Sequence, residues 1–234
     1  MPAVSGPLHA ALSASIPLVC FLTAVIWLAR VAEATGVAGA IAGVLSRAAG
    51  ARMARVYALV CVACALLTAA LSLDGAVVVM VPVVLALAER GAPARPLLLA
   101  TIGVANAFSI AVVQGNPTNL VVMTGLHLGP ATFDATMVAP GLAAALICAG
   151  AVAVRERRAL CGAMAPAAPV QLGRGAAVAA AALVLAGAGE SLAPVAGVAP
   201  WWPACAVAAG AALCLAASGA ELPGPAVPCG SGSS

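Results

Sequence analysis

A polar, helix-breaking segment interrupts an otherwise apolar run between residues 97 and 123. It consists of Gln114, Gly115, Asn116, Pro117, Thr118 and Asn119. Pro117 lacks an amide hydrogen and Gly115 frees the backbone, so we expect the helix to break here. In a bilayer, such backbone is tolerated only where it is buried in protein or lines a cavity. Because amides and hydroxyls can replace a solute's water shell, the segment predicts a broken transmembrane helix at a solute site.

The composition indicates that this segment belongs to a membrane protein. Hydrophobic residues make up 64% of the chain and charged residues 7%, against roughly 45–50% and 25% in soluble domains. The chain is therefore expected to be an all-α integral membrane protein. The sequence has no nucleophile–base set, no clustered metal ligands and no phosphate-binding glycine loop. It therefore predicts neither an enzyme nor a cofactor, and the Arg residues are expected to set topology and not to bind nucleic acid.

The apolar runs predict the helices and their grouping. We expect a span at 8–29, an interfacial helix at 31–46, a hairpin at about 56–88, the broken helix at about 97–123, a span at 135–154, and a pair at 176–192 and 201–217. The corresponding units are a first transporter repeat (1–160), a cytoplasmic connector (161–175), the start of a second repeat (176–218) and a disordered tail (219–234).

The expected hairpin has a short second arm. Residues 76–88 number about thirteen, fewer than the roughly 20 that cross a bilayer. A re-entrant hairpin with its tip at Leu73-Asp74-Gly75 therefore fits better than two ordinary spans, which remain the alternative. With the N-terminus outside, all ten Arg residues fall on the cytoplasmic side, as the positive-inside rule requires. The loops at 127–134 and 194–200 fall outside and carry none.

Several polar residues allow two interpretations. Asp74 at membrane depth indicates a functional carboxylate, or a residue that caps the second arm of the hairpin. The segment at 114–119 can be a solute site or a kink satisfied by neighbouring helices. Asn106 and Ser109 can line the pathway or bond backbone carbonyls.

Two cysteines have CxxC spacing on the first hairpin arm. Cys61 and Cys64 are expected to be small buried hydrophobic residues, with a thiol site for a soft metalloid as the alternative.

Three stretches resemble a known family. Residues 66–89 (LLTAALSLDGAVVVMVPVVLALAE) resemble the hairpin of the arsenical-pump membrane protein permeases, and residues 105–122 (ANAFSIAVVQGNPTNLVV) resemble their broken helix. The helix at 140–158, with its basic end, is also similar. The wider ion-transporter superfamily includes NhaD-type sodium/proton antiporters and citrate or dicarboxylate carriers. Its members have two inverted repeats, each with a re-entrant hairpin and a broken helix, and bind substrate between tips and breaks. Where Asn-Asp-Thr or Asn-Asp-Gly is more familiar at the tip, this chain has Leu73-Asp74-Gly75.

The resemblance implies a secondary transporter that extrudes arsenite or antimonite against protons. Its substrate- or ion-binding residues would be Ser72, Asp74, Gly75, Asn106, Gln114, Gly115, Asn116, Pro117, Thr118 and Asn119, with Asp74 as the proton-coupling residue. The alternatives are a sodium/proton antiporter, a carboxylate or anion carrier, or a truncated half that does not transport without a partner. The resemblance covers roughly residues 8–218 and contains one hairpin and one break, so a truncated product, a fragment or half of a split transporter is expected. The expected setting is the bacterial inner membrane. Candidate partners are a small inorganic solute or ion, a second half-transporter or second copy, and a cytoplasmic ATPase subunit.

Overall fold

The computed structural model describes residues 5–50, 52–163, 172–173, 175–193, 198 and 201–219. Across these residues the chain forms α-helices and two short 3-10 helices, which confirms the all-α class. Three helical segments are long and apolar enough to cross a membrane, or four if the bent pair near the N-terminus counts as one span. The multi-pass membrane architecture expected from the composition is therefore present.

The N-terminal helices join at a glycine. Helices α1 (Ser5–Ala34) and α2 (Val37–Ala49) meet at Gly36, and their axes differ by 66°. The predicted boundary between a span at 8–29 and a helix at 31–46 is wrong, because α1 continues through Ala34. Charged residues near its end do not stop it. The chain turns at Gly36, whose φ of 77° is open to a residue without a Cβ.

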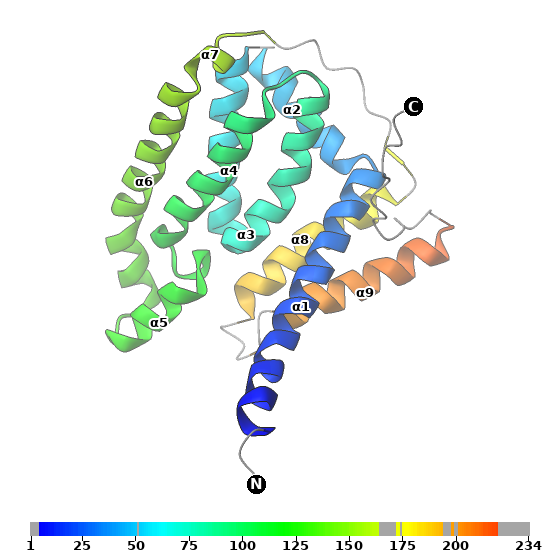
Figure 1. The fold of residues 1–234 in the computed structure, drawn as a ribbon, viewed down its shortest axis with the longest axis vertical. Helices are drawn as coiled ribbons and strands as arrows, with labels where there is room; N and C mark the ends of the chain where they lie inside the picture. The colour runs from blue at the N-terminus through cyan, green and yellow to red at the C-terminus, as the bar shows by residue number, and fades with distance from the viewer. Residues whose placement is uncertain are drawn as a thin grey trace.

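Helix α3 (Met53–Glu89) is a hairpin. Its 37 residues would extend about 55 Å if straight. Its start directly follows α2, yet Arg90 at its other end donates from Nη2 to the Gly39 carbonyl of α2 at 3.1 Å. The chain folds back at Ser72, where φ is 75° and ψ is 170°, and Figure 1 shows the two arms side by side. The predicted hairpin is confirmed, with its break at Ser72, the first residue of the tip at 72–75 that the resemblance implies.

The predicted broken helix is also confirmed. Helix α4 (Ala94–Phe108) ends in the 3-10 helices η1 (Ser109–Ala111) and η2 (Val113–Gly115), and helix α5 (Pro117–Gly125) follows. The irregular backbone therefore begins at Ser109, earlier than the polar segment alone indicates. Pro117 is the first residue of α5, a position that tolerates its missing amide hydrogen.

Helix α6 (Pro130–Arg155) starts earlier than expected. Residues 127–134 were predicted to form a polar loop, but Pro130 opens the helix and Asp134 lies in its second turn. Proline is favoured at the first helical position, so the helix begins there despite the polar residues that follow. The short helix α7 (Arg157–Leu160) ends this part of the chain.

A small-residue core joins these elements. Side chains from both hairpin arms, α2, α4 and α6 are buried together, among them Val60, Cys64, Val84, Leu97 and Ala145. Packing is close enough that a Cβ added at Gly103 of α4 would lie 2.5 Å from the sulfur of Cys148 on α6. Small residues at such contacts are typical of membrane helices, whose backbones approach closely.

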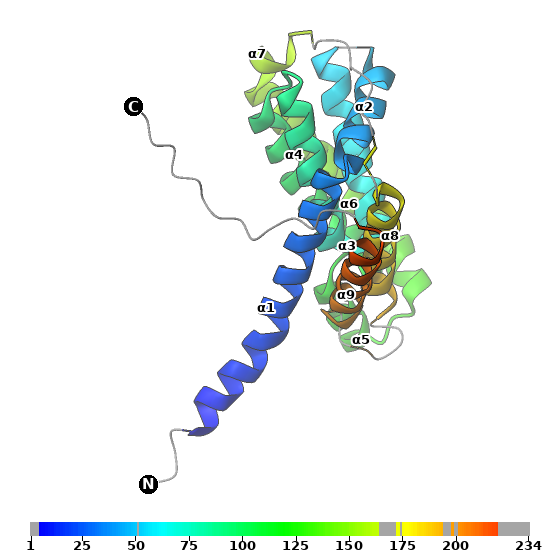
Figure 2. The ribbon, with the colours of Figure 1, turned by 90° about the vertical axis from the view of Figure 1, so that its right-hand side faces the viewer.

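The predicted last pair forms helices α8 (Ala176–Leu192) and α9 (Trp201–Ala217). Together with α1 they bury a second apolar cluster that includes Leu28, Ala179 and Leu215. Figure 2 shows α8 and α9 beside α1, whose N-terminal part extends beyond them. Whether this pair opens a second repeat stays a prediction. The turn at 194–200 apart from Val198, most of the connector and the tail beyond residue 219 lie outside the described residues.

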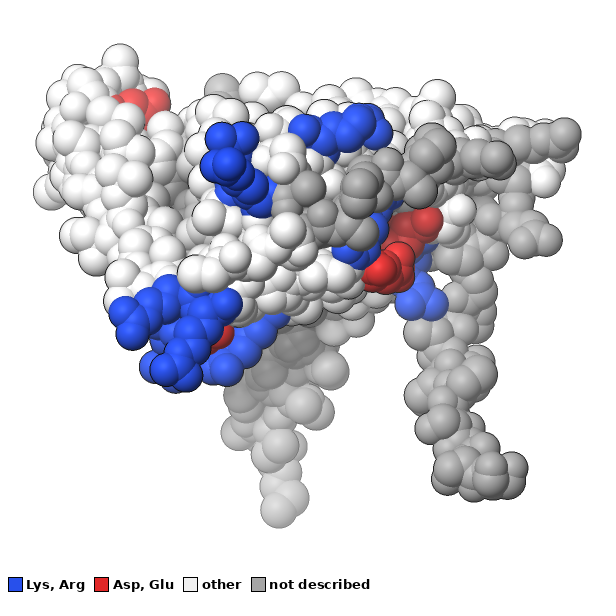
Figure 3. All heavy atoms as spheres, turned by 90° about the horizontal axis from the view of Figure 1, so that it is seen from above, with Lys and Arg blue, Asp and Glu red and all other residues white. Residues whose placement is uncertain are grey.

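Helix ends that carry Arg meet at one end of the molecule. Arg95 at the start of α4 pairs with Glu156 after α6 at 3.5 Å. The Met53 amide at the start of α3 donates to the Gly162 carbonyl at 3.2 Å. Figure 3 looks onto this end and shows the Arg side chains gathered there. The Leu126–Gly129 turn lies at the opposite end of α6 and carries no Arg.

Candidate functional site

The hairpin tip has a strained backbone. Ser72 has φ 75° and ψ 170°, a region that is almost restricted to glycine and costs about 1–3 kcal/mol. Its Oγ accepts a long hydrogen bond, 3.5 Å, from the amide of Gly75. Ser72 thus caps the second arm of α3, as serine commonly does at a helix start.

The Asp74 carboxylate is uncommitted. It is exposed, and within the described part of the chain it forms no hydrogen bond or ion pair. The capping role considered from the sequence belongs to Ser72. Asp74 lies in the first turn of the second arm, where the free amides of a helix N-terminus favour negative charge. It is free to meet a cation, a proton or a solute at the tip.

The irregular backbone of the break is held by side chains from two helices. Asn119 of α5 is 7% exposed and donates from Nδ2 to the carbonyls of Ser109 at 2.7 Å and Val112 at 2.8 Å. Asp134 of α6 accepts from the Val113 amide through Oδ1 at 2.8 Å. These bonds satisfy groups that a continuous helix would have paired internally.

Two further residues shape the break. A Cβ added at Gly115 would collide with the carbonyl oxygen of Ser109, so only glycine fits this turn. Asn116 accepts from the Thr118 amide through Oδ1 at 3.0 Å and caps α5. The break is therefore a built structure with a defined helix start and not a simple kink.

The tip and the break are joined directly. Gln114 in η2 donates from Nε2 to the carbonyl of Ala69, on the first hairpin arm, at 3.1 Å. Figure 1 shows the lower end of α3 beside the segment between α4 and α5. Ala69 precedes the Ser72 turn by three residues, and Gln114 precedes the α5 cap by two. The second hairpin arm and α5 therefore each begin a few residues after one partner of this hydrogen bond.

Asn106 and Ser109 form hydrogen bonds with backbone carbonyls of α4. Asn106 donates from Nδ2 to the Ile102 carbonyl at 2.8 Å, and Ser109 donates from Oγ to the Asn106 carbonyl at 2.8 Å. Of the two interpretations from the sequence, these contacts favour backbone bonding. Asn119, predicted as a ligand, has both amide hydrogens committed to carbonyls.

Sequence reasoning missed Asp134. Its carboxylate was taken for a loop residue, although Pro130 ahead of an apolar run is a helix-start signal that would have placed it near the base of α6. Its contact with Val113 spans 21 residues along the chain, so no local pattern reveals it.

The CxxC cysteines lie in the hairpin core. Cys64 is buried and Cys61 is half-buried. Within the described residues no group of three or more His, Cys, Asp or Glu side chains could hold a metal ion. These observations favour small hydrophobic residues over a thiol site.

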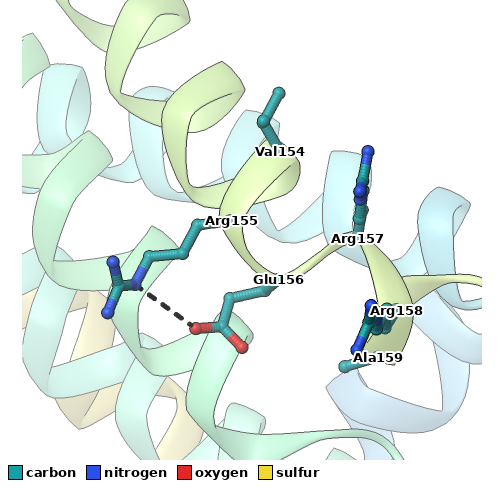
Figure 4. Close-up of a pocket in the computed structure, with 6 residues that line it drawn as sticks. All are labelled: Val154, Arg155, Glu156, Arg157, Arg158 and Ala159. Carbon is teal, nitrogen blue, oxygen red and sulfur yellow. Dashed lines mark ion pairs between the residues drawn. The ribbon is translucent and has the colours of Figure 1, made fainter.

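A separate groove lies at the Arg-rich end. It has a volume of about 590 Å³ and is lined by Val154, Arg155, Glu156, Arg157, Arg158 and Ala159. Figure 4 shows Arg155 turned toward Glu156, with an ion pair of 3.9 Å between them, and Arg157 and Arg158 pointing elsewhere. The groove contains none of the predicted site residues and is a solvated basic surface.

The comparison with protein families decides the assignment. The sequence model of the CitMHS family, described as citrate transporter, matches residues 1–223. The chain belongs to the citrate transporter family. No curated protein and no solved structure matches it.

Citrate transporters of this family belong to the ion-transporter superfamily, as the hairpin and break motifs predicted. The chain is accordingly a secondary membrane transporter and not an enzyme. The match lends no support to arsenical resistance. It favours the carboxylate or anion carrier that was the alternative interpretation of the sequence.

Proposed function

We propose that this citrate transporter family member carries a citrate-like carboxylate together with a cation, through a site between the hairpin tip and the break. The carboxylate class is supported by the family match. The observation that carries the location is the Gln114–Ala69 hydrogen bond, which joins the break to the first hairpin arm a few residues before α5 and the second arm begin. Each N-terminus is equivalent to roughly half a positive charge, and such ends are ready anion sites.

The Asp74 carboxylate makes a cation necessary. Two like unit charges about 4 Å apart repel by roughly 4 kcal/mol at an effective dielectric constant of 20. An anionic substrate beside unpartnered Asp74 would lose much of what the helix ends contribute. A proton or sodium ion on Asp74 removes this repulsion, so substrate and cation should enter together.

The test is uptake by the full chain in proteoliposomes. Radiolabelled citrate should accumulate when an inward proton or sodium gradient is imposed, and only slowly without one. Asp74→Asn should abolish gradient-driven accumulation, whereas Glu89→Gln, an exposed carboxylate at the far end of the same hairpin, should leave it unchanged. Accumulation that is insensitive to Asp74→Asn would refute the coupling role.

Arsenite or antimonite efflux coupled to protons is the second candidate. It is supported by the motif resemblance and by the exposed amide of Gln114 and hydroxyl of Thr118, which suit a neutral hydroxide. Sodium/proton exchange without an organic substrate is the third. The same proteoliposomes distinguish these candidates when they are loaded with arsenite, or with sodium, and no citrate. Export of arsenite or sodium by a protein that does not take up citrate would replace the carboxylate assignment.

We also propose that the Arg-rich end faces the cytoplasm of a bacterial inner membrane, with the N-terminus outside. The gathering of Arg at one end supports this orientation. Cys161, exposed beyond α7, should resist a membrane-impermeant maleimide in intact cells and react in inverted vesicles. A cysteine placed at exposed Leu126 should behave in the opposite way. Labelling of Cys161 in intact cells would reverse the topology.

A further inference from the structure

Two guanidinium groups converge where α2 meets the end of the hairpin. A Cβ added at Gly43 would lie 3.4 Å from Nη1 of Arg47 and 3.4 Å from Nη1 of Arg90. Both cations thus approach one buried position on α2, and they can do so because residue 43 has no side chain. Within the described residues neither guanidinium forms an ion pair.

Arg90 has an unused buried donor. Its Nη2 is bound to the Gly39 carbonyl, but its Nη1 is buried and has no hydrogen-bond partner among the residues that the structure describes. A buried charged donor left unpaired is costly, and a second cation beside it adds repulsion. The nearest acidic residues along the chain, Glu33 and Glu89, are exposed and do not pair with it. Among the described residues the two guanidinium groups therefore have no acidic partner.

We propose that Arg47 and Arg90, which approach each other beside Gly43, bind the phosphate of an anionic lipid. Arginine pairs well with phosphate because its fork of donors matches the oxygens. The site lies at the Arg-rich end of a membrane-embedded bundle, where lipid headgroups are found. Val44, next to Gly43, is 56% exposed and apolar, so an acyl chain has a surface beside the headgroup. The proposal is independent of the substrate assigned to the tip and break.

A bound phosphate would hold the base of the hairpin against α2. Arg90 ends the second arm, and Arg47 lies in the last turn of α2. A phosphate held by both would tie the hairpin base to α2. Lipid binding should therefore stabilise the folded chain against heat.

The test uses the full chain in a neutral detergent. Phosphatidylglycerol should raise its unfolding temperature, and phosphatidylcholine should do so less. Arg47 is exposed, and its side chain forms no hydrogen bond within the described part of the chain. In Arg47→Gln, half-maximal stabilisation should require about tenfold more phosphatidylglycerol, because one charge-assisted contact is lost. Arg158→Gln, in the basic groove, is the matched control and should respond like wild type.

Three results would overturn the proposal. One is an unchanged phosphatidylglycerol response in Arg47→Gln. Another is an equal loss in Arg158→Gln, which would indicate general charge attraction. The third is full stabilisation by inorganic phosphate alone, which would assign the site to a soluble oxyanion. Arg90→Gln is a second variant, whose lipid response should be lost even though its Gly39 contact also weakens.

Discussion

Helix α6 contains two glycines, Gly141 and Gly150. Replacing each by alanine distinguishes the effect of helix propensity on stability from the effect of packing against the break. A Cβ added at Gly141 would lie 2.6 Å from the Cβ and 2.9 Å from the Cα of Ala111 in η1. A Cβ added at Gly150, on the same helix, would have nothing within 4 Å. Alanine is a better helix former than glycine by about 0.5–1 kcal/mol. Gly150→Ala should therefore raise the free energy of unfolding by about that amount.

Gly141→Ala gains the same helix propensity, but its new methyl group must displace the backbone of Ala111. The Ala111 backbone cannot move aside by changing a rotamer, and overpacking of this kind costs about 1–3 kcal/mol. Because the propensity terms cancel, the two variants should differ in unfolding free energy by that packing cost.

The assay is reversible unfolding by dodecyl sulfate in mixed micelles, followed by circular dichroism. Citrate uptake should fall in Gly141→Ala, because Ala111 and the break are displaced, and should persist in Gly150→Ala. Equal stability of the two variants, or a more stable Gly141→Ala, would show that α6 does not press on the break as described.

Substitutions at Asn119, Ser72 and Asp134 test the tip and the break further. Asn119→Ala leaves two backbone carbonyls without donors and should cost about 1–3 kcal/mol in the same unfolding assay, whereas exposed Asn106→Ala should cost less than about 0.5 kcal/mol; equal costs would contradict the scaffold role. Ser72→Gly should be at least about 1 kcal/mol more stable than Ser72→Ala, because only glycine relieves the strained φ, and the reverse order would argue against the strain. Asp134→Ala should reduce citrate uptake and speed hydrogen exchange at Val113, and Asp134→Asn, which can still accept that hydrogen bond, should restore both in part; unchanged exchange in Asp134→Ala would remove its positioning role.

The hairpin and the broken helix could be predicted because their signals are local. In the sequence, a second arm of about thirteen residues next to Asp74 and Gly75 predicts a hairpin turn. In the structure the arm is longer, from residue 73 to residue 89, and a re-entrant tip stays a prediction. Pro117 and Gly115 inside an apolar run indicate a break. Both signals arise from backbone chemistry within a few residues, so the sequence carries them without any knowledge of the partner helices.

The roles of individual polar residues could not be predicted in the same way. Asn119 was predicted to bind solute, which stays a prediction, but the sequence did not indicate that its Nδ2 donates to backbone carbonyls seven and ten residues earlier. Asp134 was taken for a loop residue, but it contacts the break from α6. A polar side chain near a site can bind solute or hold backbone, and only the three-dimensional arrangement distinguishes the two.

The class of substrate could not be predicted from local motifs. The hairpin and break motifs indicate the superfamily but resemble the arsenical pumps, whereas the match over residues 1–223 assigns the chain to the citrate transporters. At the proposed site, selectivity would depend on the groups that are left to face the solute after the backbone of the break is satisfied, such as those of Asp74 and Thr118.

Hydrogen–deuterium exchange with and without citrate, read by mass spectrometry on the full chain in nanodiscs, tests the central claim most directly. If the hairpin tip and the break form one carboxylate site, citrate should slow exchange in peptides that cover residues 69–76 and in peptides that cover residues 109–119. Peptides from the basic groove at 154–159 should not change. Protection at the groove alone, or at neither the tip nor the break, would contradict the account.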